Sequence, residues 1–483
     1  MNENSIFEQL LKIEEDPEIL NFRFRLNNIP MWLFVRNYIF WEVIKNKNNL
    51  AEPHVKQEVK NLSLKEKIIY IKNVIKKYPF KINKRYKILI IDVDINNVKE
   101  GNFYVNRISD PIYSVYKKDA FYFENSSKLR FSEPRKFSTY SYDLFLILRK
   151  FLNRFSIYDD NYDRINIEKF ITYLKLRFEK NSFNLNQTLR ENVRKQLNII
   201  SRNLKINKYF YNFLLEKIEP NILFLEDAHE LNCKDLIYYA KKSGITVIEP
   251  QHGYVGKDHI GYNFNPNIFE YIKEYLPDYF LTFGKFWSDN IRTPSKKIEI
   301  GFPYLEEKVK MARQLRNKEV KDKRNILIIS GGTLPEEYVN LVKKLYNFLD
   351  KNRFKIVFRP HPSERISLNE RYKDIIYMGV KIDLDNLYES LSKYDIVLSF
   401  EKSTVLYEAL AFGAKVILII YRNEFYDKTN NLFLETDYDM ESIADIINNE
   451  YNNHTFQNLE YVWKSNSKQN LINFLNSIEN NVA

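Results

Sequence analysis

The feature that most constrains the fold is a recurring segment in which a short apolar run ends in a polar loop. In the clearest case, Phe354–Phe358 is followed by Arg359–Pro362, and Asp395–Leu398 is followed by Ser399–Thr404. The second polar loop then leads into an apolar helical segment, Val405–Phe412. Buried strands that alternate with helices are typical of a parallel α/β sheet. This region therefore predicts such a sheet.

The same alternation occurs along most of the chain and predicts two such sheets. Further core strands are expected at Tyr86–Val93, Asn221–Leu225, Ile245–Ile248, Tyr279–Thr282, Ile298–Ile300, Asn325–Ser330 and Lys415–Ile420. The charged segment Glu306–Lys323 marks a domain boundary. We therefore expect an α/β protein with two doubly wound, Rossmann-type domains facing each other across a cleft. The predicted division is a helical N-terminal extension (1–80), an N-terminal domain (81–305), a C-terminal domain (306–465) and a C-terminal helical tail (466–483).

Composition and charge limit the classes of function. The 483 residues carry a net charge of +11, which favours anionic partners such as phosphorylated substrates, an anionic membrane face or nucleic acid. The basic residues are scattered, so specific nucleic-acid binding is not expected. Cys233 is the single cysteine, which excludes a disulfide framework and fits a reducing cytoplasm. The N-terminus lacks signal-peptide features, and no run approaches the ~18–20 apolar residues of a spanning helix. A cytoplasmic protein is expected.

Three other segments carry local predictions. Pro30–Arg36 opens an aromatic helix, interpreted either as a packing helix of the first domain or as a membrane-interface helix. Phe103–Tyr116 is predicted to be a loop. Asp92 and Asp94 are interpreted as the end of a strand and not as a metal-binding Asp-x-Asp pair.

The loops that end the strands carry the predicted binding chemistry. Ligands of open parallel sheets bind outside the carboxyl ends of the strands, so His361 and the Ser403 loop are expected to line one anion-binding site. Ser403 or Thr404 can cap the following helix and donate a hydroxyl to a phosphate at its N-terminus. Glu408, about one turn into that helix, can accept from ribose hydroxyls.

Further residues complete the predicted binding site. Gly331, Gly332 and Thr333 form a loop whose backbone N–H groups can approach a ligand closely. Arg359 is expected to add positive charge if its side chain faces the cleft.

Candidate proton acceptors lie in the first domain. His252 follows a predicted strand, and Asp227, next to Glu226, follows another. Asp258 and His259 are further candidates. His229 is assigned a structural role.

The order of the motifs resembles a known family. Between about residues 221 and 420 the chain shows Gln-His-Gly, Phe-Gly-x-x-Trp, Ile-Gly-x-Pro, Gly-Gly, Arg-Pro-His-Pro and Ser-x-x-x-Ser-Thr-x-x-x-Glu-Ala. This is similar to GT-B glycosyltransferases of bacterial surface polysaccharides. The clan includes capsule polysialyltransferases, Kdo transferases and the CDP-glycerol glycerophosphotransferases of teichoic acid synthesis.

The resemblance implies roles for individual residues. His361, Ser403 and Thr404 would hold the phosphate of a cytidine-type donor, Glu408 would contact the ribose, and His252 would be the base. No cofactor or metal would be required. The partners would be a nucleotide-sugar donor and a glycan or lipid-linked acceptor, with association at the inner face of the membrane.

The predicted function is therefore glycosyl transfer from a nucleotide-activated sugar to a surface-polysaccharide or lipid-linked acceptor. The alternatives are a CDP-alcohol phosphotransferase and a non-hydrolysing UDP-sugar epimerase. The sequence departs from the family pattern at Gly413–Lys415 and at Glu401-Lys402. These departures leave the donor nucleotide open.

Overall fold

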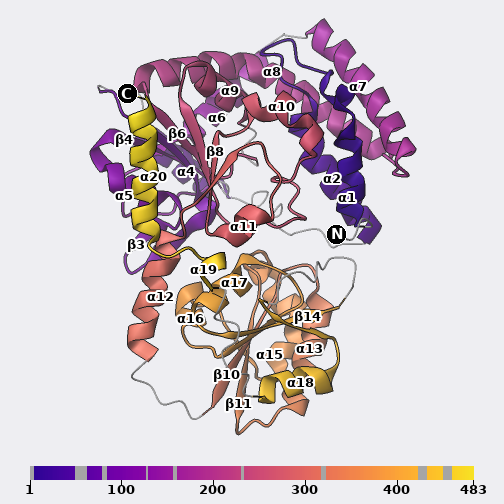
Figure 1. Cartoon of the computed structure of the whole chain (residues 1–483), viewed down its shortest axis with the longest axis vertical. Helices are drawn as coiled ribbons and strands as arrows, with labels where there is room; N and C mark the ends of the chain where they lie inside the picture. The colour runs from indigo at the N-terminus through magenta and orange to yellow at the C-terminus, as the bar shows by residue number, and fades with distance from the viewer. Residues whose placement is uncertain are drawn as a thin grey trace. The chain divides into compact units, whose positions relative to one another are not determined.

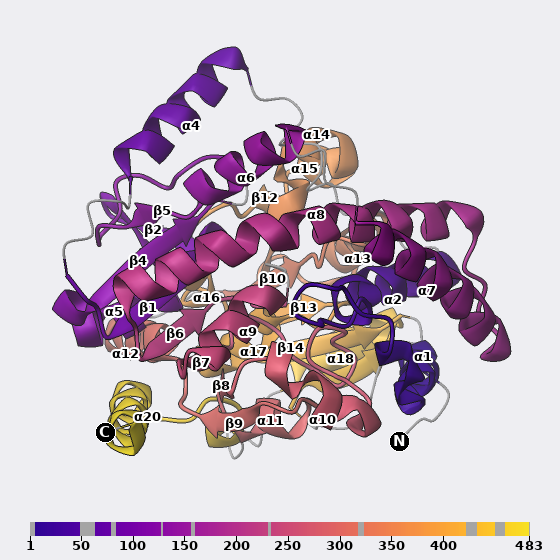
Figure 2. The same ribbon diagram turned by 90° about the horizontal axis from the view of Figure 1, so that it is seen from above.

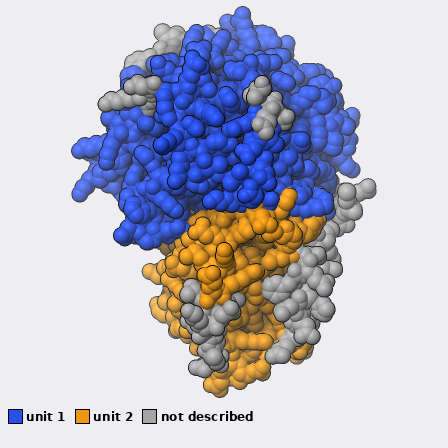
Figure 3. Space-filling model, turned by 60° about the vertical axis from the view of Figure 1, so that its left-hand side comes forward, with its two compact units in different colours: residues 1–49, 62–300, 468–483 blue, residues 50–61, 301–467 orange. Residues whose placement is uncertain are grey.

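The structure is a computed structural model, and it describes residues 5–48, 63–78, 84–126, 129–155, 160–229, 233–316, 323–421, 432–449 and 459–482. The chain forms two compact units (Figures 1 and 3). Unit 1 comprises Met1–Asn49, Leu62–Ile300 and Lys468–Ala483, and unit 2 comprises Leu50–Asn61 and Gly301–Ser467. Each unit contains one parallel sheet flanked by helices, as the sequence predicts.

Unit 1 is built on a seven-stranded sheet in the order β5-β4-β1-β6-β7-β8-β9. Every pairing in it is parallel. The strands are β1 (Ile88–Val93), β4 (Ala120–Asn125), β5 (Tyr140–Ser141), β6 (Ile222–Leu225), β7 (Thr246–Pro250), β8 (Tyr279–Thr282) and β9 (Lys296–Glu299). The chain adds β4 and β5 on one side of β1 and then returns to add β6 on the other. The topological switch point of this sheet therefore lies between β1 and β6.

Helices cover both faces of this sheet, which explains why its strands are continuous apolar runs. In β1, Leu89 and Ile91 pack into a core with α6, α8 and α9, whereas Ile88 and Ile90 pack into another with α5 and α20. Unit 1 contains α1 (Ile6–Leu11), α2 (Trp32–Asn48), α4 (Leu64–Lys76), α5 (Ser109–Tyr116), α6 (Asp143–Phe155), α7 (Asn161–Lys180), α8 (Gln187–Ile218), α9 (Lys234–Lys242), α10 (Phe269–Ile272), α11 (Lys285–Asp289) and α20 (Ser467–Val482).

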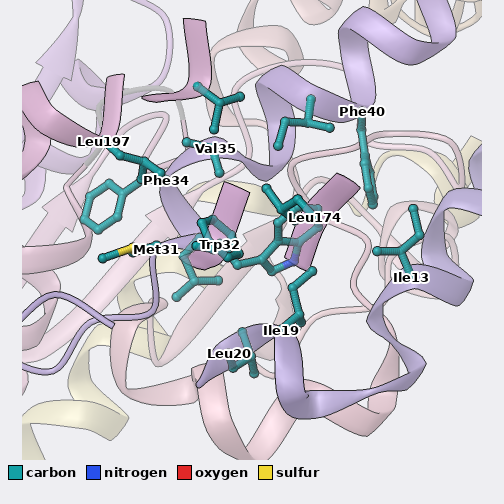
Figure 4. Close-up of a cluster of buried hydrophobic side chains, with 14 of the residues drawn as sticks. Ile13, Ile19, Leu20, Met31, Trp32, Phe34, Val35, Phe40, Leu174 and Leu197 are labelled. Atoms are coloured by element: carbon teal, nitrogen blue, oxygen red, sulfur yellow. The ribbon is translucent and has the colours of Figure 1, made fainter. Parts of the chain in front are cut away.

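The aromatic N-terminal segment forms part of the interior of unit 1. Trp32 is fully buried in a cluster that joins α1 and α2 to α7 and α8 (Figure 4). Its indole nitrogen donates to Glu14, which also pairs with the buried Arg36. A buried charge is stable only when it is paired and hydrogen-bonded, as it is here. The packing interpretation of this helix is therefore confirmed.

Unit 2 is built on a six-stranded parallel sheet in the order β12-β11-β10-β13-β14-β15. Its strands are β10 (Arg324–Ile329), β11 (Phe354–Arg359), β12 (Lys381–Ile382), β13 (Ile396–Ser399), β14 (Lys415–Ile420) and β15 (Leu434–Asp437). Its helices are α12 (Pro303–Arg316), α13 (Pro335–Phe348), α14 (Leu368–Arg371), α15 (Lys373–Tyr377), α16 (Leu387–Leu391), α17 (Thr404–Ala411), α18 (Met440–Asn448) and α19 (Leu459–Val462). The switch point lies between β10 and β13.

Some features differ from the sequence predictions. The predicted loop Phe103–Tyr116 contains β3 (Phe103–Asn106), which forms an antiparallel hairpin with β2 (Asn97–Glu100), and then helix α5. The chain divides into units at Ile300, and the described helices α1, α2 and α4 of the predicted extension, together with α20 of the predicted tail, belong to unit 1. The physical reason is that residues of α2 and α20 contribute directly to the apolar cores of unit 1.

Candidate active site

The loops that follow β10, β11 and β13 lie at one edge of the unit 2 sheet. Ile329 is in register with Arg359, and Ile328 with Leu398, so these parallel strands end side by side. This places the Gly331–Thr333 loop and the Ser399–Thr404 loop on either side of the switch point. Ligands of open α/β sheets bind at such a point.

The backbone donors of the glycine loop are occupied by a carboxylate of the protein itself. Glu401 accepts from the backbone N–H of Gly331 at 2.7 Å and from that of Thr333 at 3.2 Å. The hydroxyls of Thr333 and Tyr338 also donate to it. Burial raises the pKa of Glu401, and these hydrogen bonds oppose the rise. The predicted anion-binding loop thus holds an internal anion.

His361 lies against this loop. A Cβ added to Gly332, which has φ of +99°, would come within 3.3 Å of the His361 ring. Nδ1 of His361 contacts the Ser363 hydroxyl at 2.7 Å, and its backbone N–H donates to the buried Glu364. Neighbouring protein atoms desolvate the ring and lower its pKa, although the residue as a whole is exposed. A neutral imidazole at this position can donate one hydrogen bond to a ligand oxygen.

Ser403 and Thr404 begin helix α17 beside the switch point. Ser403 is the N-cap in extended conformation, but its side chain makes no capping hydrogen bond. Both residues are partly exposed. A helix N-terminus presents unpaired N–H groups and positive potential to an anion. The predicted side-chain cap by Ser403 is therefore absent, and its hydroxyl is not used to cap the helix.

Arg359 and Glu408 are engaged inside unit 2. The Arg359 guanidinium is buried and pairs with Asp383 at 2.7 Å, with a second hydrogen bond to Ser390. Its side chain therefore stabilises the end of β11, and the charge predicted for the ligand site is neutralised. Glu408 is buried in α17 and accepts from the Tyr388 hydroxyl at 2.8 Å.

A second cluster lies at the carboxyl edge of the unit 1 sheet, after β6 and β7. Asp227, with φ of +61°, occupies a tight turn two residues before His229. Nδ1 of His229 lies 2.9 Å from Asp227 Oδ1 and 4.0 Å from Glu249 Oε1. Glu249 accepts from the Ala228 backbone and from the Tyr262 hydroxyl. Two carboxylates thus hold one imidazole at this edge.

Two further histidines surround this pair. Nε2 of His252 lies 3.8 Å from Asp227 Oδ1, and the ring is stacked on that of His229. His259 contacts the edge of the His229 ring. The chain passes so close to His229 that a Cβ at Gly261 would lie 2.4 Å from its ring. Half of the protein's six histidines gather at this point.

The surroundings of His229 and His259 shift their pKa values in opposite directions. Burial by itself lowers the pKa of His229, but the contacts with Asp227 and Glu249 outweigh it and raise the pKa to about 10. Burial and the charge of His229 lower the pKa of His259 to about 3. At neutral pH, His229 is therefore a cation and His259 is neutral. Groups with pKa values pushed apart in this way are typical of acid–base sites.

The other predicted acceptor residues lie outside this histidine cluster. Asp258 is exposed and accepts from the Tyr254 hydroxyl at 3.1 Å. Glu226 is buried and accepts from Ser109 at 2.5 Å. Burial raises the pKa of Glu226 to about 7.

Asp92 belongs to a buried network at the end of β1. Arg135 lies 3.4 Å from Asp92, 2.9 Å from Asp110 and 3.2 Å from Glu124. Burial raises the pKa of Asp92 well above its usual value, against the lowering effect of Arg135. Arg135 therefore compensates several carboxylates at the switch point of unit 1. Within the described residue ranges, no group of three or more His, Cys, Asp or Glu side chains is arranged to hold a metal ion.

Sequence reasoning missed the position of His229 in this cluster. The Asp227-x-His229 spacing directly after a strand was the available signal, because a turn brings residues i and i+2 together. Glu249 gave a second signal, since it ends the neighbouring strand. Neither spacing shows that Tyr262 and His259 close the cluster, because these residues reach it through a loop with little regular structure.

Comparisons with known proteins find only distant structural similarity. No family model and no curated protein matches this chain. Solved structures similar to it include the UDP-GlcNAc 2-epimerase from Neisseria meningitidis, at 12% identity and a TM-score of 0.44, covering 81% of this chain and 99% of that chain. The wall teichoic acid polymerase TagF is similar at 13% identity and a TM-score of 0.38, covering 90% of this chain and 92% of that chain. MurG from Acinetobacter baumannii is similar at 10% identity and a TM-score of 0.42, covering 82% of this chain and 98% of that chain. Because these TM-scores lie below 0.5, the fold assignment rests on the two parallel sheets themselves.

Proposed function

We propose that this chain transfers a glycosyl group from a nucleotide-activated sugar to a hydroxyl of a surface-polysaccharide or lipid-linked glycan acceptor. The observation that carries the proposal is the Asp227–His229–His252 cluster at the carboxyl edge of the unit 1 sheet. It supplies what an acceptor hydroxyl needs, which is a proton acceptor beside a carboxylate that stabilises the resulting cation.

In this proposal, unit 2 binds the nucleotide-sugar donor. Ser403, Thr404 and the N-terminus of α17 would bind donor phosphate, with His361 donating to a phosphate oxygen. These groups lie at the edge where ligands of parallel sheets bind. Glu408 is assigned a packing role in this proposal because it is buried and bonded to Tyr388.

In this proposal, unit 1 binds the acceptor and removes the proton from its hydroxyl. His252 would take the proton of the acceptor hydroxyl as that oxygen bonds to the anomeric carbon of the donor sugar. The bond from that carbon to the donor phosphate oxygen breaks, and its electron pair leaves with the nucleotide. His229 is protonated at neutral pH, so it would provide positive charge and not accept the proton. The proposal requires no metal, and unchanged turnover in a chelator would support that part of it.

A nucleotide panel provides the first test. The thermal unfolding of the purified protein is measured in the presence of CMP, CDP, UDP, GDP or ADP. A nucleotide that binds the folded state, at about a hundred times its Kd, should stabilise the protein by about 2.7 kcal/mol. The double variant Ser403→Ala/Thr404→Val should lose the nucleotide-dependent shift in melting temperature. Ser392→Ala is the control: it removes a hydroxyl directly after α16, away from the proposed phosphate site, and should keep the shift. His252→Asn should retain the shift and lose turnover. The donor site is refuted if no nucleotide shifts the melt, or if the double variant retains the full shift.

Turnover assays then separate the three reactions. Sugar transfer to an acceptor with nucleotide release supports the proposal. Conversion of a UDP-sugar to its epimer without acceptor would replace it with an epimerase. Release of CMP from CDP-glycerol would indicate phosphoalcohol transfer.

A further inference from the structure

Helix α4 carries a row of exposed apolar side chains along one side. Leu64, Ile68, Ile71 and Ile75 are separated by four, three and four residues, which places them on one face of a helix. Their exposed fractions are 75%, 46%, 48% and 61%. Single exposed apolar residues are ordinary, but a contiguous row indicates a surface that binds something.

The other side of α4 is anchored in unit 1, which fixes the direction of the exposed row. Tyr70 and Val74 are buried, and the Tyr70 hydroxyl donates to Asp143 at the start of α6 at 2.8 Å. Lys77, directly after the helix, pairs with the buried Glu124 at 2.7 Å. Because the buried face is held by these contacts, the apolar row points away from the core of unit 1.

Lysines run along the border of the apolar row. Lys65, Lys72 and Lys76 follow one another at intervals of seven and four residues, on the side of the row away from Tyr70, and all three are exposed. Lys67 lies on the opposite border and is also exposed. Long lysine side chains can reach charged groups while their stems cover apolar surface. An apolar face bordered by lysines is typical of helices that lie in a membrane interface.

The neighbouring helix α6 also carries exposed apolar side chains. It contacts α4 and lies beside it in unit 1 (Figure 2). Leu148, Phe151 and Leu152 on α6 are 42%, 57% and 49% exposed. Lys150 and Arg154 on the same helix are also exposed. Each of these two neighbouring helices thus carries exposed apolar side chains together with exposed basic ones, and these residues are here called the α4–α6 surface.

We propose that the α4–α6 surface binds the headgroup region of a bilayer that contains anionic lipids. The exposed apolar side chains would enter the boundary between headgroups and acyl chains, and the lysines would contact lipid phosphates. Charge complementarity favours this occupant, because the surface is basic and the whole chain carries +11. Among the described residues, no helix is long and apolar enough to cross a bilayer, so the contact would be peripheral. The inference does not depend on the proposed reaction.

Vesicle co-sedimentation of the full chain tests this proposal. We expect binding to phosphatidylcholine vesicles that contain phosphatidylglycerol, and weak binding to phosphatidylcholine alone. The variant Ile68→Ser/Ile71→Ser/Ile75→Ser should lower the partition coefficient at least about tenfold, because it removes most of the apolar row. Lys65→Gln/Lys72→Gln/Lys76→Gln should remove the preference for anionic vesicles, and so should high salt.

A matched control distinguishes binding by this surface from non-specific binding by exposed apolar residues elsewhere. Ile366, Tyr377 and Leu384 in unit 2 are 69%, 77% and 49% exposed, and changing all three to serine should leave vesicle binding unchanged. All variants alter exposed positions, and their circular dichroism melts should match the wild type. The proposal is overturned if the wild type binds neither vesicle, or if the isoleucine variant binds as well as the wild type. It is also overturned if light scattering shows a dimer that only the isoleucine variant disrupts, which would identify a second copy as the occupant.

Discussion

At the scale of single residues, Glu401 has the most direct consequence for ligand binding. Its carboxylate takes the backbone N–H groups of Gly331 and Thr333 that an anionic ligand at this loop would use. A phosphate at Ser403, only two residues away, would also experience its negative charge. Glu401 therefore limits how tightly this edge holds an anion.

We expect Glu401→Gln to strengthen nucleotide binding. The amide oxygen can still accept from the loop, but the charge that repels phosphate is gone. The Kd of the nucleotide that stabilises the wild type should fall about tenfold, which corresponds to about 1.4 kcal/mol. Isothermal titration calorimetry measures this change. Glu435→Gln on strand β15 removes the same charge elsewhere in unit 2 and should leave Kd unchanged. Equal or weaker binding by Glu401→Gln would contradict this role.

The protonation of His229 predicts a stability change with pH. Its pKa is raised from 6.5 to about 10 in the folded protein, so folding favours the protonated form. The resulting stability is fully present below about pH 6.5 and is lost as the pH rises through about 10. Between these values, the advantage of the wild type over His229→Gln should shrink by up to about 1.4 kcal/mol per pH unit.

Urea unfolding at several pH values measures this effect. His259→Gln is the control, because the pKa of His259 is about 3 and its charge does not change in this range. The free-energy difference between the wild type and His259→Gln should therefore stay constant above neutral pH. A pH-independent difference for His229→Gln would show that His229 is not held as a cation.

At the scale of elements, the loop between β7 and β8 determines how closely the histidines pack. Gly261 passes so near the His229 ring that an added methyl group would overlap it. We expect Gly261→Ala to destabilise the protein by about 1–3 kcal/mol, as overpacking commonly does. In the double variant His229→Ala/Gly261→Ala the ring is absent, so the cost of the second substitution should largely vanish. Additive costs in thermal unfolding would show that the ring is not the obstacle.

The sequence predicts elements better than it predicts their contacts. Apolar runs such as Ile88–Val93 and Lys415–Ile420 locate core strands, because both faces of each sheet are buried. The hairpin of β2 and β3 has no such run, and the segment that holds β3, Phe103–Tyr116, is predicted as a loop. The strand-end loops were predictable, since every parallel strand ends at the same edge.

The contacts within these loops depend on strand order and could not be predicted from spacing. Glu401 reaches Gly331 across 70 residues only because β13 pairs with β10. Arg359 was expected to face a ligand, yet the turn after β12 brings Asp383 to it and forms a buried ion pair. His252 approaches Asp227 because β7 pairs with β6.

At the scale of the whole molecule, the chain leaves unit 1 after Ile300 and returns to it with α20. Leu471, Leu475 and Ile478 of this helix are buried against Ile88 and Ile90 of the central strand β1. We expect Leu475→Ala to destabilise unit 1 by about 2–5 kcal/mol, because it opens a cavity in this core. Gln469→Ala on the exposed side of α20 should change the stability by less than about 0.5 kcal/mol.

Thermal unfolding of Leu475→Ala with and without nucleotide shows whether the destabilisation is confined to unit 1. If unit 2 binds the nucleotide, the ligand-dependent shift should persist in this variant while the transition of unit 1 moves to lower temperature. Loss of the nucleotide shift together with the stability would contradict this assignment of roles to the two units.

Because α20 follows unit 2 in the sequence but packs in unit 1, unit 1 can be completed only after unit 2 has been synthesised. A ribosome finishes residues 301–467 before it makes the segment that fills the core beside β1. Unit 2 can therefore complete its sheet while one face of the unit 1 sheet still lacks its last helix. During that interval, nascent chains expose apolar side chains of β1 that the finished protein covers. This stage of translation is the one at which chaperone binding should matter most.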